Sequence, residues 1–129
     1  MSGLRRLLGG WGAPILMAWL LAGPALAAYP EQSIKLVVGF PPGGGGDLYG
    51  RLIAQALSKT VGQSVVVENK TGAGGNIAAE AVAKARPDGY TLSQMPNGVF
   101  RMPAMMERAP WNPMRDFTWI IRLVGYMGG

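Results

Sequence analysis

The sequence predicts an α/β domain built around a parallel sheet. Three short segments rich in strand-forming residues recur along the chain, at 34–40, 64–69 and 90–95. Two segments with helical spacing of apolar residues separate them, at 48–57 and 77–85. Strands that alternate with helices in this order form parallel sheets with right-handed crossovers and with helices on the faces. The length of 129 residues allows one domain at most.

The first predicted strand, residues 34–40, is a nearly continuous apolar run, which is typical of a strand covered on both faces. Pro41 and Pro42 end it, because proline has no N–H group to donate to a neighbouring strand. Four consecutive glycines, 43–46, then allow backbone angles that are closed to other residues. The segment therefore predicts a tight turn whose backbone a ligand can approach closely.

The first predicted helix follows this turn, with Asp47 expected as its N-cap. Gly62 is expected to end the helix. A strand that leads through glycines into a helix N-terminus leaves N–H groups unpaired at the positive end of the helix dipole, which predicts an anion-binding site. The apolar face of this helix is predicted to consist of Leu48, Leu52, Ile53, Ala56 and Leu57.

A second unit of strand, glycine loop and helix follows. Residues 64–69 predict a strand, and the glycine-rich loop 70–76 comes directly after it. Asn76 is expected to be the N-cap of a helix that runs through Ala85, and Glu80 is spaced to pair with a lysine four residues later. The apolar stripe of this helix is narrow and consists of Ile77, Ala78, Ala81 and Val82.

A proline- and glycine-containing turn at 86–89 leads into the third predicted strand, at 90–95. Asn97 and Gly98 follow in a third loop. Further along, we expect a short helical piece at 102–107 and a fourth strand at 117–124.

The three loops each follow a predicted strand. Because the carboxyl ends of parallel strands lie at the same edge of a sheet, we expect all three loops to meet there. One glycine loop alone would be explained equally well by a structural turn. Recurrence of such loops after three strands favours a ligand site.

The first 27 residues have the pattern of a secretory signal. Arg5 and Arg6 form a positive region, residues 7–21 form an apolar centre, and Ala-Leu-Ala at 25–27 is a cleavage motif. We expect cleavage after this motif and a periplasmic mature chain, residues 28–129. A single transmembrane anchor is the alternative, but glycines and prolines interrupt the segment and no positively charged cluster follows it.

Composition argues against several classes of function. The net charge of +5 falls by two, to +3, if Arg5 and Arg6 leave with the signal, and the other basic residues are scattered. We therefore expect no nucleic-acid partner. Cysteine and histidine are both absent, so the sequence lacks a thiolate metal site, the commonest zinc ligand and the commonest general base. We expect neither a metal nor a cofactor.

Enzymatic and nucleotide-binding motifs are also missing. The acidic residues form no readable acid–base pair, and no serine has a nucleophile-elbow context. A Walker loop requires a lysine after its glycines, whereas Asp47 follows them here. The dinucleotide fingerprint fails as well, because a start at Gly43 or Gly44 places no glycine at its last position.

The order of these motifs resembles that of a known family. YPEQSIKLVVGFPPGGGGDLYGRLIAQAL at 29–57 and GQSVVVENKTGAGGNIAAEAVAKARPDGYTLS at 62–93 resemble the substrate-binding proteins of tripartite tricarboxylate transporters, the Bug family. NPMRDFTWII at 112–121 resembles the segment that leads into the fourth strand of that family. The resemblance extends from about Tyr29 to Gly129.

The resemblance implies a two-lobed, type II periplasmic binding-protein fold that closes on its ligand. It implies a small organic anion as ligand (a di- or tricarboxylate, an acidic amino acid or an aromatic acid) and membrane permease subunits as partners. By this analogy, Asp47 orders its loop rather than contacting the acid directly. The positions that hold the ligand, largely through backbone N–H groups and bridging water, are Pro41, Pro42, Gly43, Gly44, Gly45, Gly46, Asp47, Gly72, Ala73, Gly74, Gly75, Asn76, Asn97 and Gly98.

The chain stops just after the fourth predicted strand, where members of the family continue into a second lobe. We therefore expect residues 28–129 to be part of the first lobe, to bind ligand weakly or not at all alone, and to be marginally stable. The alternatives are an inert truncated product, a domain that acts only through contacts with a sensor or transporter, and a small α/β enzyme or nucleotide-binding protein.

Overall fold

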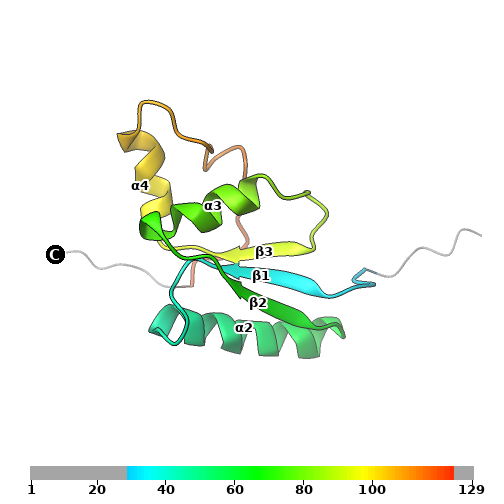
Figure 1. The fold of residues 1–129 in the computed structure, drawn as a ribbon. Coiled ribbons are helices and arrows are strands. Elements are labelled where there is room, and N and C mark those ends of the chain that lie inside the picture. The colour runs from blue at the N-terminus through cyan, green and yellow to red at the C-terminus, as the bar shows by residue number, and fades with distance from the viewer. Residues whose placement is uncertain (1–28, 124–129) are drawn as a thin grey trace, which may run out of the picture.

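Three parallel strands form the sheet of the computed structural model, which describes residues 29–123 (Figure 1). The strands are β1 (Ile34–Val38), β2 (Val65–Asn69) and β3 (Thr91–Gln94), in the spatial order β2-β1-β3. Both pairings of β1 are parallel, which confirms the predicted α/β architecture for its first three strands.

The register of the sheet aligns the carboxyl ends of the strands. Val38, the last residue of β1, lies opposite Asn69 in β2 and opposite Gln94 in β3. The loops that leave these three residues therefore start from one edge of the sheet, as the sequence predicted.

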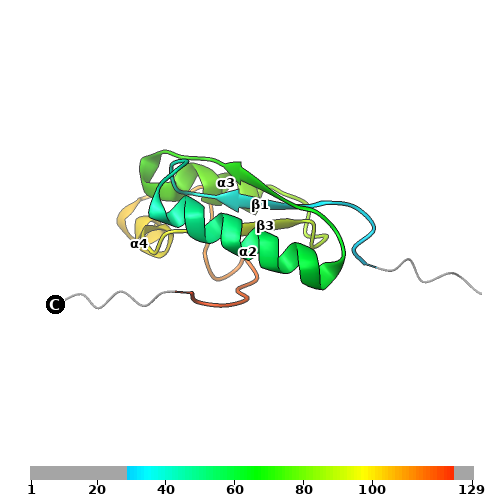
Figure 2. The same ribbon diagram turned by 90° about the horizontal axis from the view of Figure 1, so that it is seen from below.

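The helices cover opposite faces of this sheet. Helix α2 (Gly45–Val61) lies on one face, and α3 (Asn76–Ala83) and α4 (Gly98–Met105) lie on the other (Figures 1 and 2). The connection out of β1 thus turns to one face, while the connections out of its neighbours β2 and β3 turn to the other. In open α/β sheets, a crevice at such a reversal is the usual place for a ligand.

The core lies on both sides of β1. Leu36 and Val38 pack with Ala54 of α2 in one cluster, while Val99 of α4 and Trp111 belong to a second cluster with α3. The hydrophobic residues of β1 are almost completely buried, as expected for a strand covered on both faces.

Helix α2 contacts the sheet through a face that matches the predicted one only in part. The buried residues of this helix are Asp47, Gly50 and Ala54. Leu48 and Leu52 are 60% and 53% exposed. A Cβ atom at Gly50 would lie 2.8 Å from Cγ2 of Val38, so the helix approaches the sheet closely at a residue without a side chain. Of the predicted face, Ile53 packs against the core cluster and Leu57 is half-buried, whereas Ala56 is exposed like Leu48 and Leu52.

Helix α3 also differs in detail from its prediction. It ends at Ala83 rather than Ala85, and Ile77, predicted to lie in its apolar stripe, is half exposed. Ala78 of the predicted stripe is buried, Ala81 and Val82 are half-buried, and Ala79, which was not predicted, is buried as well. The predicted ion pair of Glu80 and Lys84 is present.

The carboxyl-terminal part of the described chain is less regular than predicted. Helix α4 begins at Gly98 instead of residue 102 and contains Pro103. Residues 117–123 of the predicted fourth strand are irregular, and Val124 lies outside the described residues. An extended segment becomes a strand only where a neighbouring strand exchanges backbone hydrogen bonds with it. The spacing of apolar residues does not show whether such a neighbour exists.

Within residues 29–123, no helix is long and apolar enough to cross a membrane. The predicted signal segment, 1–27, lies outside the described residues.

Candidate functional site

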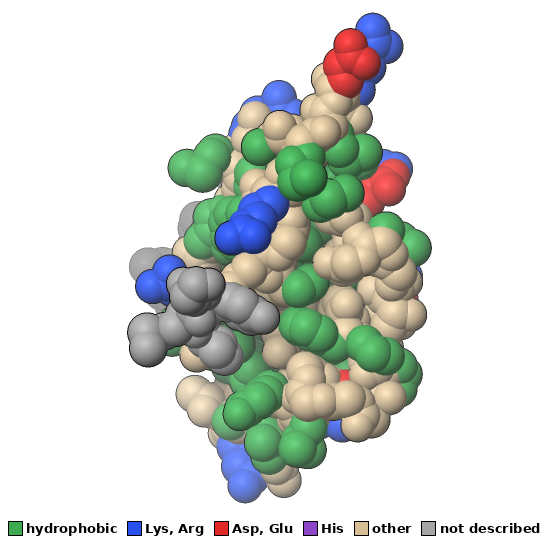
Figure 3. Space-filling view, turned by 90° about the vertical axis from the view of Figure 1, so that its left-hand side faces the viewer, with side chains coloured by type: hydrophobic (Ala, Val, Ile, Leu, Met, Phe, Trp, Pro, Cys, Tyr) green, Lys and Arg blue, Asp and Glu red, His purple; other side chains and the backbone are tan. Residues whose placement is uncertain are grey.

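Three helical N-termini gather at the carboxyl edge of the sheet. Helix α2 follows β1, the short 3₁₀ helix η2 (Ala73–Gly75) and α3 follow β2, and α4 follows β3. Figure 3 looks onto this edge, where hydrophobic side chains, uncharged polar side chains and backbone form most of the visible face and basic side chains also appear. Helix N-termini carry unpaired N–H groups and a partial positive charge, so the edge is suited to an anion.

The loop between β1 and α2 is shaped by two different requirements for glycine. Gly43 has a φ of +78°, which is unfavourable for residues with a Cβ atom. Gly46 has no such angle, but a Cβ there would lie 2.3 Å from the ring of Phe40. The loop is closed by a hydrogen bond of 3.2 Å from Gly44 N–H to the carbonyl of Pro41.

The first turn of α2 leaves donors available. Gly44 is the N-cap, without a side-chain hydrogen bond, and its carbonyl accepts the N–H of Leu48. Among the described residues, the N–H groups of Gly45 and Gly46 have no acceptor. These two groups are the clearest donors for an anion at this edge.

Asp47 lies inside the first turn of α2 and is not the N-cap that was predicted, because the glycines before it already belong to the helix. Its side chain is buried and accepts hydrogen bonds from Gly43 N–H, Arg51 Nε and Asn69 Nδ2, at 2.9, 2.9 and 2.8 Å. The bond from Arg51, with those from Gly43 and Asn69, lowers the pKa of Asp47 to about 2. Asp47 is therefore an anion held within the protein that orders its loop.

The loop between β2 and α3 has an unusual backbone. Gly72, Ala73, Gly74 and Gly75 all have positive φ angles, of 120°, 47°, 66° and 92°. Only Ala73 pays the steric cost of a Cβ in this region, roughly 1–2 kcal/mol. The sequence GAGG thus matches the conformation that this loop adopts.

Asn76 is another residue whose predicted role changes. It is the first residue of α3, and Gly75 occupies the N-cap position without a side-chain hydrogen bond. The side chain of Asn76 is buried and donates from Nδ2 to the carbonyl of Ala73. It therefore fixes the turn before the helix from within.

The second and third loops touch each other and the end of β1. A Cβ on Gly75 would lie 2.3 Å from Cγ of Pro96, and one on Gly39 would lie 3.1 Å from Cδ of the same proline. A Cβ on Gly98 would lie 3.7 Å from the carbonyl oxygen of Gly74. Pro96, which sequence reasoning did not select, is therefore the point where these loops meet.

The structure thus brings the predicted site residues to one edge in two groups. One group is the loop from Pro41 to Asp47 on the α2 side, and the other is the loop from Gly72 to Asn76 with Gly98. The side chain of Asn97 is exposed and forms no cap bond with α4. Arg51 and Asn69 were missed, although the spacing of four residues between Asp47 and Arg51 could have indicated their ion pair.

Two basic side chains next to the first and second glycine loops are engaged with acids. Arg51 pairs with Asp47, and Lys70, which begins the second loop, pairs with Glu68 at 2.7 Å. Lys35 contacts the other oxygen of Glu68 at 2.8 Å, and the hydrogen bonds from these two lysines hold the pKa of Glu68 below its usual range. Because Arg51 and Lys70 are held by acids, recognition of an anion by the first two loops would depend on their backbone N–H groups. Nowhere in residues 29–123 do three or more potential metal-ligating side chains gather.

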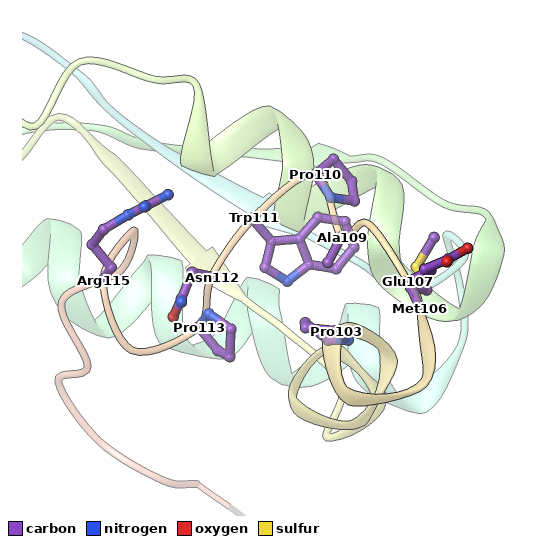
Figure 4. Close-up of a pocket in the computed structure, with 9 residues that line it drawn as sticks. All are labelled: Pro103, Met106, Glu107, Ala109, Pro110, Trp111, Asn112, Pro113 and Arg115. Carbon is purple, nitrogen blue, oxygen red and sulfur yellow. The ribbon is translucent and has the colours of Figure 1, made fainter.

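A separate hollow of about 350 Å³ lies between the end of α4 and residues 109–115 (Figure 4). Its wall includes the ring of Trp111, three prolines and the side chains of Asn112 and Arg115. It does not include the glycine loops. Trp111 is also a core residue, which packs with Ala79 and Val99 and is only 4% exposed.

The sequence matches the model of one protein family. Residues 49–129 match the family described as the tripartite tricarboxylate transporter family receptor, TctC. The chain belongs to this receptor family. The predicted resemblance to the Bug proteins is thereby confirmed, and the family is one of transport receptors rather than of enzymes.

Similar proteins come from several bacteria. The chain is 42% identical to the UPF0065 protein in the gbd 5′ region of Cupriavidus necator, over 85% of this chain and 34% of that protein. It is 44% identical to the protein BugT of Bordetella pertussis, over 69% of this chain and 27% of BugT. The chain therefore spans about a third of the length of the curated relatives it matches.

A solved structure confirms the fold. A protein described as a periplasmic transporter superposes with a TM-score of 0.63 at 44% identity, covering 68% of this chain and 30% of that one. The receptor chain thus has the α/β fold of part of such a protein.

Proposed function

We propose that this chain forms the part of a solute receptor that binds a carboxylate group of a small organic anion for a tripartite transporter. The observation that carries the proposal is the meeting of three helical N-termini at one sheet edge, with free donors at Gly45 and Gly46. Membership of the tricarboxylate receptor family supports the chemical class of the ligand.

The chemistry needs no cationic side chain. A hydrogen bond between a backbone N–H group and a charged oxygen contributes roughly 1.5–3 kcal/mol, so a few such bonds orient a carboxylate. The second loop, Gly72–Asn76, and the third, at Asn97 and Gly98, would supply further contacts directly or through water. Di- and tricarboxylates, acidic amino acids and aromatic acids all offer the group that these loops would hold.

The remaining features of the proposal concern the cellular setting. Residues 1–27 would direct export to the periplasm, and residues 28–129 would contribute to the first lobe of a two-lobed receptor. Permease subunits in the membrane would receive the solute. The family description supports this setting, because it names a receptor of a transporter.

A thermal-shift experiment on the purified chain tests the ligand class. Succinate and citrate should raise the melting temperature in a concentration-dependent way, because a ligand that binds only the folded state stabilises it. Succinamide, which has the shape of succinate without its charges, is the matched control and should have no effect. We expect affinity in the millimolar range.

ATP is the second comparison ligand, because it tests the alternative of a nucleotide-binding protein. Stabilisation by ATP but not by carboxylates would contradict the proposal. Equal stabilisation by succinate and succinamide would also contradict it, since the charge would then play no part.

A further inference from the structure

The carboxylate of Asp47 connects three separate segments of the chain. Its Oδ2 accepts hydrogen bonds from Gly43 N–H and from Arg51 Nε, each at 2.9 Å. Its Oδ1 accepts one from Asn69 Nδ2 at 2.8 Å. The donors belong to the first glycine loop, to helix α2 and to the last residue of β2.

Asn69 extends this connection. Besides Oδ1 of Asp47, its Nδ2 also donates to the carbonyl of Phe40, at 3.1 Å. Asn69 therefore holds the first loop at its beginning, through Phe40, and at its end, through Asp47. The next residue, Lys70, opens the second loop and donates its own N–H to the carbonyl of Val38.

These contacts argue against a direct role for Asp47 in binding. Only 3% of the residue is exposed, and both oxygens already have donors. The negative charge of Asp47 would also repel an anionic ligand. This charge is balanced within the protein by Arg51, whose Nε lies 2.9 Å from Oδ2 of Asp47. The bonds of Asp47 are directed toward other parts of the protein.

We propose that Asp47 is a positioning residue that, together with Asn69, fixes the first glycine loop relative to the carboxyl end of β2. The inference rests on the proposed function for its effect on ligand affinity. The mechanical connection between the two segments can be tested without any ligand.

Hydrogen exchange measured by NMR on the full chain tests the connection. In Asn69→Ala, the amide of Gly43 should exchange about tenfold faster, because a hydrogen bond to a charged acceptor is lost or weakened. Asn69 does not contact this amide, so the effect must pass through Asp47 or Phe40. Asp47→Asn should produce a similar increase, because an amide group cannot accept hydrogen bonds on both sides.

Glu80→Gln is the matched control, since Glu80 is also a helical carboxylate paired with a basic residue four positions later. It should leave the exchange of Gly43 unchanged. The amide of Val37, in the centre of the sheet, reports on global stability. An unchanged Gly43 in Asn69→Ala, or an increase that merely equals the one at Val37, would overturn the inference.

Ligand affinity supplies a second readout. At a temperature where each variant is folded, Asp47→Asn and Asn69→Ala should each weaken succinate binding about tenfold, and the double variant should be no weaker than the worse single one. Losses that multiply in the double variant would overturn the coupling.

If succinate does not bind even the unchanged chain, the proposed function fails, and the exchange rates still decide the inference. If Asp47→Asn does not fold, Asn69→Ala carries both measurements.

Discussion

At Asp47, one carboxylate determines the conformation of a loop that has almost no side chains of its own. The bonds that it accepts stabilise its charged form, so its pKa is about 2 compared with an ordinary value of 3.8. A carboxylate whose pKa is lower in the folded state stabilises the fold at pH values above its unfolded pKa. This contribution is lost as protonation proceeds.

We predict that the stabilising effect of Asp47 disappears between pH 3.8 and about 2. Urea unfolding of the unchanged chain and of Asp47→Asn at a series of pH values measures it. The difference in unfolding free energy should be constant at neutral pH and should shrink as pH falls through this window. A difference that grows on acidification would contradict the assignment, because it would require a raised pKa.

At the scale of elements, the sequence predicted the helices and strands better than the surfaces by which they pack. The three strands of the sheet were predicted because their runs of strand-forming residues stand between turn signals. The predicted apolar face of α2 was only partly right: Ile53 packs against the core, but Leu48 and Leu52 do not, because the helix lies closest to the sheet at Gly50. The fourth strand failed since a strand depends on a partner, which local spacing does not reveal.

For the candidate site, too, the general placement could be predicted, but the contacts of individual side chains could not. The convergence of the three loops follows from topology, so it could be predicted from the order of strands and glycines. The roles of Asp47 and Asn76 could not, because glycines can begin a helix without any side-chain signal and shift the caps toward the N-terminus. Asn69 was missed because its partners are 22 and 29 residues away in the sequence.

Gly50→Ala tests the packing of α2 against β1. Alanine improves helix propensity by up to about 1 kcal/mol, but overpacking of a core contact costs roughly 1–3 kcal/mol. We therefore expect net destabilisation of about 0–2 kcal/mol in chemical unfolding. Gly45→Ala is the control, because a Cβ there meets no atom within 4 Å. If the Gly50→Ala variant proved as stable as Gly45→Ala, the close contact between α2 and β1 would be contradicted.

At the scale of the whole molecule, the described chain combines a small core with much exposed apolar surface. Leu48, Tyr49 and Leu52 of α2 are more than half exposed, as are Ile120 and Ile121. The core beside β1 depends on few large side chains, so the stability of the chain should be sensitive to each of them.

Two leucines provide a matched test of this distribution. Leu36→Ala should destabilise the chain by about 2–5 kcal/mol, because it leaves a cavity beside β1. Leu52→Ala should change stability by less than about 1 kcal/mol, since most of that side chain is already in water. Equal losses in urea unfolding would show that the exposed face of α2 is covered in solution.

The central claim is that the three loops at the carboxyl edge bind a carboxylate through their backbone. NMR spectra of the chain during titration with succinate test it most directly, with succinamide as the uncharged control. We predict that the amide signals of Gly45, Gly46 and Gly74 shift with succinate and not with succinamide. Shifts confined to other parts of the chain, such as the hollow beside Trp111, would contradict the claim.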